Sequence, residues 1–422
     1  ATPRAKFTAK IFVKKRVSGI VMEFQFGTNW STYSRFVGDV FGSALAAEGI
    51  FAFFLESGFL AVLVFGWDRV SKRMHFFSAC MVWFGSIFSA VWIVIANSWQ
   101  QTPAGFHVVG EGADARAEIT DFWAMVFNPS SMDRLIHVLL GSFLTGAFVV
   151  MSITAYYVLK GRHVRLAKKA FGVALVYGFI TSVAIGASGH SQARLLHDTQ
   201  PAKLAAFEGH FETGPGDLTL FGIPDAEAKK THYAIGIPNL LSFLVHDDFS
   251  KPVTGLDAIP EENWPPLLVP FVTYRIMVGL GVFMLALTAL GLFMRWRGQL
   301  VNNRWMMRLF VVSVFAPYIA NQTGWVSAEV GRQPWVVYGL LRTSDAVSRS
   351  VSGAETMTSI IMFGLIYLLL GALWVFVMNS KIQHGPEEPD ASDEEDEGSF
   401  LQVARVARAE NASLTDAREE AS

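Results

Sequence analysis

Seven windows of about 20 residues that hold almost no charged side chain constrain this 422-residue chain more than any other feature of its sequence. A helix needs roughly 20 apolar residues to cross the hydrocarbon core of a bilayer. The sequence therefore predicts an all-α fold, a polytopic bundle of transmembrane helices. The expected spans lie at about 38–66, 76–98, 134–159, 170–188, 267–294, 307–326 and 354–378.

The overall composition agrees with a lipid environment. The chain is 52% hydrophobic and 17% charged, whereas soluble domains average roughly 45–50% apolar and about 25% charged residues. This composition argues against a soluble enzyme, a disordered scaffold and a protein whose partner is a nucleic acid. The single cysteine, Cys80, falls inside an apolar window, so neither a disulfide framework nor a cysteine-based metal site is expected.

The beginning of the chain differs from the rest. The short apolar stretch Val17–Phe26 is too short to cross a bilayer alone, and it follows the basic segment Lys10–Arg16. The chain begins at Ala1 rather than at a methionine. We expect Val17–Phe26 to be the remnant of a helix in a sequence that was processed or is incomplete at its start.

The distribution of basic residues predicts how the bundle is oriented. The loops 67–75, 160–169 and 295–306 are rich in Lys and Arg, which places them in the cytoplasm by the positive-inside rule. The long loop 189–266 then faces outward and is the candidate binding element. Residues 385–422 carry twelve acidic residues and three arginines, for a net charge of −9. This segment is expected to be a disordered cytoplasmic tail.

Two carboxylates occur inside the first span, where an ionisable group is costly and by default marks a functional site. Glu48 and Glu56 are eight residues apart, which in an α-helix corresponds to about 12 Å along the axis and about 80° around it. They would form a loose row suited to carrying protons. The alternative is a pair of structural carboxyls held in interhelix hydrogen bonds.

His137 and Met277 lie near the outward ends of two other spans, and Arg275 is close to the methionine. A histidine nitrogen and a methionine sulfur form an axial pair that holds haem iron in cytochromes. The residues alone leave two alternatives open, because methionine is common in apolar spans and a lone histidine is often a hydrogen-bonded core residue.

Glu329 opens the segment Glu-Val-Gly-Arg-Gln-Pro-Trp335 near the outer end of a further span. Within it, Gly331 allows a close backbone approach, and Arg332 can bind a carboxylate or a haem propionate with two parallel hydrogen bonds. The alternative is a capped turn with an exposed arginine.

Several segments together resemble subunit I of the cytochrome bd-type ubiquinol oxidases, in the order in which that family carries them. They extend over residues 22 to 335, and their motifs are specific in combination. The segments are Met22-Glu-Phe-Gln-Phe-Gly-Thr-Asn-Trp30, Glu48-Gly-Ile-Phe-Ala-Phe-Phe-Leu-Glu-Ser57, Ala96-Asn-Ser-Trp-Gln-Gln-Thr-Pro103, Tyr274-Arg-Ile-Met277 and Gly324-Trp325 through Gly331-Arg-Gln-Pro-Trp335.

The resemblance implies ligands for two haem groups. His137 and Met277 match the axial ligands of a low-spin haem b, and Arg275 matches a neighbour of that haem. Glu329 matches the carboxylate ligand of one high-spin haem, with Arg332 close to the haem propionates. The expected cofactors are thus a low-spin haem b, a high-spin haem b, and a haem of d type or a second haem b at the oxygen site.

The resemblance also implies a proton route and a quinol site. Glu48 and Glu56 match acids on the path of protons to the oxygen site. Lys203 and Glu208, in the outward loop, match residues linked to quinol oxidation. A cation can orient a quinol oxygen while a carboxylate accepts its proton.

The function implied is that of a quinol:oxygen oxidoreductase in which residues 1–384 form the membrane-embedded bundle. Its expected partners are subunit II, a small accessory single-span subunit, quinol and oxygen, and its expected location is the cytoplasmic (inner) membrane of a bacterium or archaeon. Two alternatives remain. One is an incomplete paralogue that oxidises quinol without reducing oxygen, and the other is a proton-coupled transporter built on a similar bundle.

One departure from the family pattern concerns the N-terminus. Family members begin with a further helix that carries a histidine ligand, whereas no histidine precedes His75 here. We therefore expect an N-terminally incomplete or divergent member.

Overall fold

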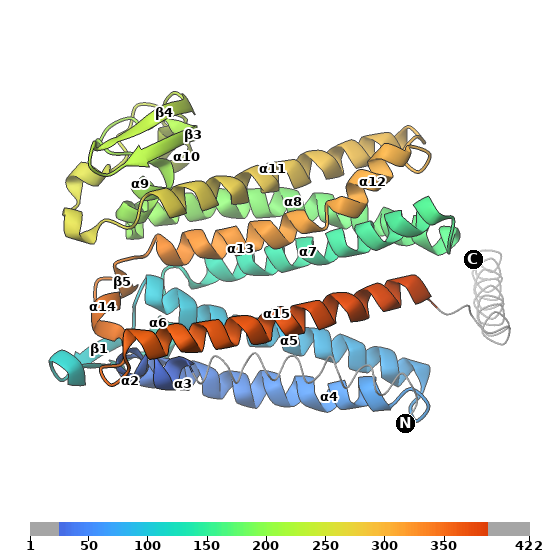
Figure 1. Cartoon of the computed structure of the whole chain (residues 1–422), viewed down its shortest axis with the longest axis horizontal. Helices are drawn as coiled ribbons and strands as arrows, with labels where there is room; N and C mark the ends of the chain where they lie inside the picture. The colour runs from blue at the N-terminus through green and yellow to red at the C-terminus, as the bar shows by residue number, and fades with distance from the viewer. Residues whose placement is uncertain (1–24, 387–422) are drawn as a thin grey trace, which may run out of the picture. The chain divides into compact units, whose positions relative to one another are not determined.

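The structure is a computed structural model that describes residues 25–386 (Figure 1). Most of Val17–Phe26 and the acidic run Glu387–Glu397 lie outside the described residues, so the predictions of a helix remnant and a disordered tail are not addressed. The chain divides into two units between Leu370 and Gly371, within the last helix. The first unit carries every site considered below, and the described part of the second unit is the end of that helix.

Within the described residues, seven helical segments are long and apolar enough to cross a membrane, which confirms the predicted fold class. Each overlaps one predicted window. The segments are α3 (Gly38–Ala47) continued through a π-helix (Glu48–Phe53) into α4 (Phe54–Phe65), α5 (Lys72–Gln101), α7 (Ser131–Lys160), α8 (Val164–Thr199), α11 (Leu268–Trp296), α12 (Arg304–Val312) with α13 (Phe315–Val330), and α15 (Gly353–His384).

Local capping explains why most spans extend beyond their apolar windows. At the start of α5, the side chain of Ser71 accepts a hydrogen bond from the backbone N–H of Met74, at 3.3 Å. Helix α7 ends at Gly161, whose φ of 69° gives the left-handed conformation that glycine adopts without strain. The side chain of Asn303 caps α12 in the same way as Ser71 caps α5. These caps let the helices continue for a few polar residues beyond the apolar stretch that crosses the hydrocarbon core.

Two spans are irregular. The π-helix Glu48–Phe53 lies between the two predicted proton carriers, so the axial and angular separation calculated for a regular α-helix does not apply to them. The predicted span at 307–326 is two helices, because α12 ends at Val312 and α13 begins at Phe315.

The main core lies among α7, α8, α11 and α12, where the fully buried side chains include Phe148, Met151, Leu175 and Phe310. Small residues permit this contact between helices: a Cβ at Gly178 of α8 would lie 3.2 Å from the terminal methyl of Met151. Close packing of this kind holds transmembrane helices together, because lipid tails are as apolar as the side chains they would replace.

A second core lies around Tyr33 and Trp99, where the outer end of α5 meets short elements. The β1–β2 hairpin pairs antiparallel with Phe106 opposite Ile119, and the β5–β6 pair aligns Trp335 with Arg342. The elements are α2 (Ser31–Phe36), β1 (Phe106–Val109), a 3-10 turn (Gly112–Asp114), β2 (Arg116–Ile119), α6 (Phe122–Val126), β5 (Trp335–Val337), β6 (Leu341–Arg342) and α14 (Thr343–Ala346).

The long outward loop is folded rather than irregular. Because α8 continues to Thr199, the loop begins about ten residues later than the predicted start at 189. It contains α9 (Pro201–Glu208), an antiparallel hairpin of β3 (Leu218–Asp225) and β4 (Lys230–Ile237), α10 (Leu240–His246), and 3-10 turns at Leu256–Ala258 and Glu261–Asn263.

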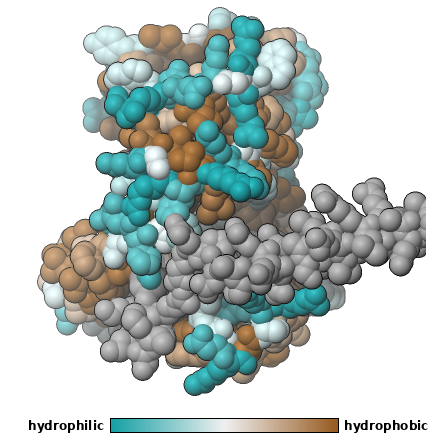
Figure 2. All heavy atoms as spheres, turned by 90° about the vertical axis from the view of Figure 1, so that its right-hand side faces the viewer, coloured by the Kyte–Doolittle hydropathy of each residue, from teal (hydrophilic) through white to brown (hydrophobic). Residues whose placement is uncertain are grey.

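The loops separate into two ends of the bundle as the basic-residue pattern predicts. Figure 1 shows the connections after α4, α7 and α11 at one end, and α9, the three hairpins and α14 at the opposite end. Figure 2 views the molecule from the first of these ends and shows hydrophilic residues gathered there. Which end faces the cytoplasm stays a prediction from the positive-inside rule.

Candidate functional site

His137 projects from α7 toward α8. Its Nδ1 lies 3.2 Å from the hydroxyl oxygen of Ser188, so this ring nitrogen already has a hydrogen-bonding partner. Histidines that ligate metals commonly use one ring nitrogen for the metal and fix the ring through the other. The arrangement therefore leaves Nε2 of His137 as the nitrogen that could bind iron.

Met277, on α11, lies against a glycine of the neighbouring helix α13. A Cβ at Gly324 would come within 2.8 Å of Met277 Sδ, and a Cβ at Gly189 would lie 3.8 Å from the His137 ring. Helices α7 and α11 both pack against α8 and α13. Both predicted axial ligands thus lie against a glycine of a neighbouring helix, and His137 and Met277 sit on helices that share the neighbours α8 and α13.

Glu208, at the end of α9, is the most buried carboxylate of the outward loop, with 1% of its surface exposed. Its Oε2 lies 3.4 Å from Nη2 of Arg275, and its Oε1 has no hydrogen-bond partner among the described residues. The same arginine donates hydrogen bonds to the carbonyl oxygens of Phe207, at 2.5 Å, and of Thr219, at 2.6 Å. Arg275 therefore joins α11, two residues before Met277, to both α9 and β3.

Burial changes the acid–base behaviour of both predicted quinol residues. Burial raises the pKa of Glu208 to about 7, although the charge of Arg275 opposes this shift. Burial also lowers the pKa of Lys203 well below its usual range, and the charge of Arg134 adds to this effect. Glu208 can therefore exchange a proton near neutral pH.

Lys203 and Glu208 have different polar partners among the described residues, and their joint role in quinol oxidation stays a prediction. Lys203 Nζ donates hydrogen bonds to the side-chain oxygens of Gln101, at 2.9 Å, and Gln200, at 3.2 Å. Glu208 instead faces Arg275. The two residues of α9 belong to two different polar groups.

The polar group around Lys203 is centred on Glu329. The carboxylate of Glu329 pairs with Arg332 at 2.6 Å and accepts a hydrogen bond from the side chain of Asn97 at 3.1 Å. Asn97 in turn accepts from Arg134, and Arg332 donates to the side chain of Gln100 at 2.8 Å.

This group holds more positive than negative charge. Arg332, Arg134 and Lys203 all interact electrostatically with Glu329. Buried Nε atoms of Arg134 and Arg332 have no hydrogen-bond partner within residues 25–386. A buried N–H group that lacks an acceptor is costly, even where the other nitrogens of the same guanidinium are paired. The site therefore fits further anionic groups, as the carboxylates of haem propionates would be.

Glu48 and Glu56 both face α5. Glu48 Oε1 accepts a hydrogen bond from Ser89 of that helix at 2.5 Å. Gly85 of α5 allows the close approach of Glu56, because a Cβ there would lie 3.2 Å from the Cβ of Glu56. The hydrogen bond of Glu48 agrees with the structural alternative as well as with a proton route.

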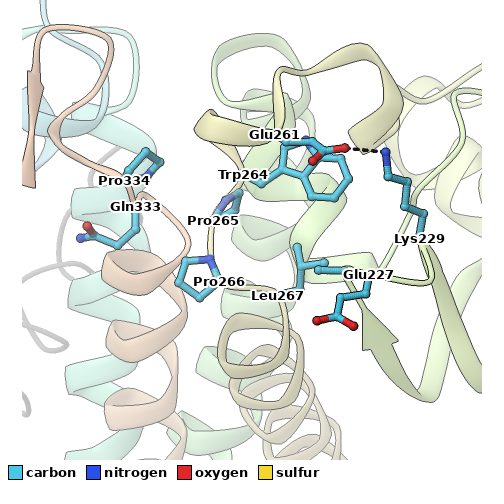
Figure 3. Close-up of a pocket in the computed structure, with 10 residues that line it drawn as sticks. Glu227, Lys229, Glu261, Trp264, Pro265, Pro266, Leu267, Gln333 and Pro334 are labelled. Carbon is cyan, nitrogen blue, oxygen red and sulfur yellow. Dashed lines mark hydrogen bonds and ion pairs between the residues drawn. The ribbon is translucent and has the colours of Figure 1, made fainter.

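A surface pocket of about 750 Å³ opens near the second half of the outward loop. Figure 3 shows Lys229 and Glu261 joined across it by an ion pair of 2.5 Å, with Trp264 beneath. None of the predicted site residues lines this pocket, whose walls are Ala226, Glu227, Lys229, Glu261, Trp264, Pro265, Pro266, Leu267, Gln333 and Pro334.

Sequence reasoning missed several partners of the predicted residues. Ser188 fixes His137, while Asn97, Gln100 and Arg134 surround Glu329 and Arg332. Their common signal is a polar side chain at or close to either end of an apolar window, where the cost of burying it calls for a partner. The ligand roles of His137 and Met277 stay predictions.

Comparison with known proteins places this geometry in a family. A model of the family described as cytochrome bd terminal oxidase subunit I matches residues 5–386. The chain is 40% identical to cytochrome bd ubiquinol oxidase subunit 1 of Bacillus subtilis, over 89% of this chain and 82% of that protein. It is 33% identical to cytochrome bd-II ubiquinol oxidase subunit 1 of Escherichia coli, over 87% and 84% of the two chains.

A solved structure agrees with these relatives. The bd oxidase from Geobacillus thermodenitrificans matches with a TM-score of 0.80 and 32% sequence identity, over 90% of this chain and 87% of that chain. The match confirms the helical membrane fold as well as the predicted resemblance. The chain belongs to the cytochrome bd terminal oxidase subunit I family.

Proposed function

We propose that this chain is the haem-binding subunit of a quinol:oxygen oxidoreductase of the cytoplasmic membrane, which oxidises quinol at its outer end and reduces oxygen to water. The observation that carries the proposal is the contact between Glu208 and Arg275. Glu208 is a buried carboxylate of the outward loop that can exchange a proton. Its partner Arg275 lies on α11, two residues before the predicted haem ligand Met277.

The first step is the loss of a proton from quinol. Glu208 accepts this proton at Oε1, the oxygen that has no other hydrogen-bond partner among the described residues. Arg275 compensates the negative charge that the carboxylate carries before it receives the proton. Because α9 buries Glu208 away from bulk water, the carboxylate keeps a pKa of about 7, close to the working pH of a general base.

The haem groups, when bound, supply stepwise electron transfer and an iron at which oxygen is reduced. His137 Nε2 and Met277 Sδ would hold the low-spin haem b, with Ser188 fixing the imidazole. Glu329 would bind a high-spin haem b, and Arg332 and Arg134 would bind propionates. A haem of d type or a second haem b completes the proposed set.

Glu48 and Glu56 would deliver protons for oxygen reduction from the cytoplasmic side. They lie in the first span and face α5, where Glu48 accepts a hydrogen bond from Ser89 and Glu56 packs closely against Gly85. The family pairs subunit I with subunit II, and we propose the same partner here, together with a small accessory subunit. The family match disfavours the proton-coupled transporter that the sequence left open, and neither the His/Met pair nor the Arg-rich group around Glu329 is needed for one.

The substitution Glu208→Gln tests the proposal, because it removes the proton acceptor and nearly conserves shape. In the complete oxidase with its partner subunit, quinol-driven reduction of the haems should slow by a factor of about 10²–10⁴. Reduction by dithionite should be unaffected. The matched control is Glu212→Gln, an exposed carboxylate in the same loop that should keep full quinol turnover. Unchanged quinol turnover in Glu208→Gln would contradict the assignment.

A further inference from the structure

The β3–β4 hairpin presents an apolar face that no described residue covers. Side chains on this face are 44% to 80% exposed, although a two-stranded hairpin outside a membrane is normally polar on its open side. The Asp, Glu and Lys residues of the hairpin are confined to its turn, between Asp225 and Lys230, and His232 of β4 is turned to Asp225, at 3.2 Å. The exposed apolar residues are Leu220, Phe221, Ile223, Tyr233, Ile235 and Ile237.

The hairpin is anchored directly beside the proposed quinol site. The carbonyl oxygen of Thr219 accepts a hydrogen bond from Arg275, at 2.6 Å, and the hydroxyl of Thr231 donates to the carbonyl of Gly209, at 2.8 Å. Strand β3 also packs against α11. The apolar face therefore begins within a few residues of Glu208 and its arginine partner.

The same anchor lies at the border of an exposed apolar stripe on α11, which in a membrane-spanning helix is the side expected to face lipid. The outer turns of this helix expose Leu268, Val269, Val272 and Ile276, each by 41% to 52%, on one side. At about 100° of rotation per residue, Arg275 lies about 70° from the middle of this stripe. A hairpin held by Arg275 thus continues the lipid-facing surface of the span. Figure 1 shows it beside the outer end of α11, at the edge of the bundle.

We infer that the apolar face of the β3–β4 hairpin is inserted into the outer-leaflet interface of the membrane, where it forms one wall of the route by which a long-tailed quinol reaches Glu208. The second half of this inference rests on the proposed function. Aliphatic side chains together with a tyrosine are typical of the membrane–water interface, where the ring lies at the level of the lipid headgroups. A lipid-soluble quinol has to leave the bilayer at this level, and its isoprenoid tail can stay against the apolar face while its headgroup reaches the buried carboxylate.

Depth-dependent quenching tests the insertion without reference to activity. The complete oxidase carrying Cys80→Ser and Ile235→Cys is labelled with a small fluorophore and reconstituted into phosphatidylcholine vesicles. The matched control is Val108→Cys, which replaces a 46% exposed aliphatic residue of the β1–β2 hairpin, among charged neighbours. A lipid with a nitroxide near its headgroup should quench the label at 235 at least about twofold more than the label at 108. Iodide, which stays in water, should quench the label at 108 more than the label at 235.

Two results would overturn the inference. Quenching of both labels mainly by iodide would place the hairpin in water. Protection of the label at 235 from both quenchers would show that another protein, such as a second copy or a partner subunit, covers this face.

Tail-length dependence tests the route separately. With a long-tailed quinol in vesicles, Ile235→Asp should raise KM by about fivefold, while Val108→Asp should not. With a short-tailed, water-soluble quinol in detergent, both variants should match the unmodified enzyme. An equal loss with both quinols would contradict the route. Failure of the proposed function is distinguishable, because then Glu208→Gln would leave turnover with either quinol unchanged.

Discussion

Replacing Gly324 of α13 with alanine should displace the sulfur of Met277 while the bundle stays folded. A Cβ at this position lies 2.8 Å from Met277 Sδ. The sulfur would have to withdraw by about 0.7–1.2 Å to restore an ordinary van der Waals separation of about 3.5–4.0 Å. It can do so because a methionine side chain has three rotatable bonds and fills irregular space easily. The predicted ligand therefore moves, and the backbone does not.

The effect on stability should be small because two contributions oppose each other. Alanine is favoured over glycine in a helix interior by about 1 kcal/mol. Overpacking a core by one methyl group costs about 1–3 kcal/mol, and the flexible neighbour places Gly324→Ala at the lower end. The net change in the free energy of unfolding should stay within about 2 kcal/mol, so the melting temperature should shift by no more than about 5 °C.

The assay compares reduced-minus-oxidised absorption spectra of the purified oxidase with its melting temperature. Gly324→Ala should shift or weaken the low-spin haem band. The control is Gly146→Ala on α7, where no atom lies within 4 Å of the added methyl group, so the band should be unchanged. A normal low-spin band in a stable Gly324→Ala protein would refute the assignment of Met277 as a ligand.

Four further outcomes are expected. Met277→Leu roughly conserves volume, so it should lower the free energy of unfolding by less than about 1.5 kcal/mol. It should still abolish the low-spin haem band. An unchanged band in a folded variant would contradict the assignment of Met277 as a ligand. Quinol turnover should rise with pH up to about 7, as Glu208 loses its proton, and Glu208→Gln should remove this dependence. Because the folded state holds that proton more tightly, the contribution of Glu208 to stability should decrease between pH 4.5 and about 7, measurable by thermal unfolding. Ser188→Ala, which frees Nδ1 of His137, should change the midpoint potential of the low-spin haem without loss of the band.

The seven spans could be predicted because their signal, an uncharged stretch of bilayer length, is local. Their ends could not be placed as well, since caps such as Ser71 and Gly161 lie in polar sequence outside the apolar windows. The π-helix that begins at Glu48 carries no local hydrophobic signal that separates it from an α-helix, so the separation of Glu48 and Glu56 predicted for a regular α-helix is wrong.

The candidate site residues were found through the family resemblance, but their partners depend on long-range contacts. Glu208 and Arg275 are 67 positions apart, and nothing in either segment alone indicates that they meet. Lys203 and Glu208, by contrast, lie on one short helix, and their nearness in the sequence does not reveal that their polar partners differ. Their separation follows from burial on different sides of α9, against Gln101 and against Arg275, which only the packed structure determines.

One measurement tests most directly whether this chain carries haem and transfers electrons from quinol. It is a reduced-minus-oxidised absorption spectrum of the purified oxidase, recorded after addition of quinol. We expect a low-spin haem b band together with high-spin features, all of them reduced by quinol. A purified, folded complex that contains no haem would contradict the proposal and would leave the proton-coupled transporter as the better interpretation of the carboxylates in the first span.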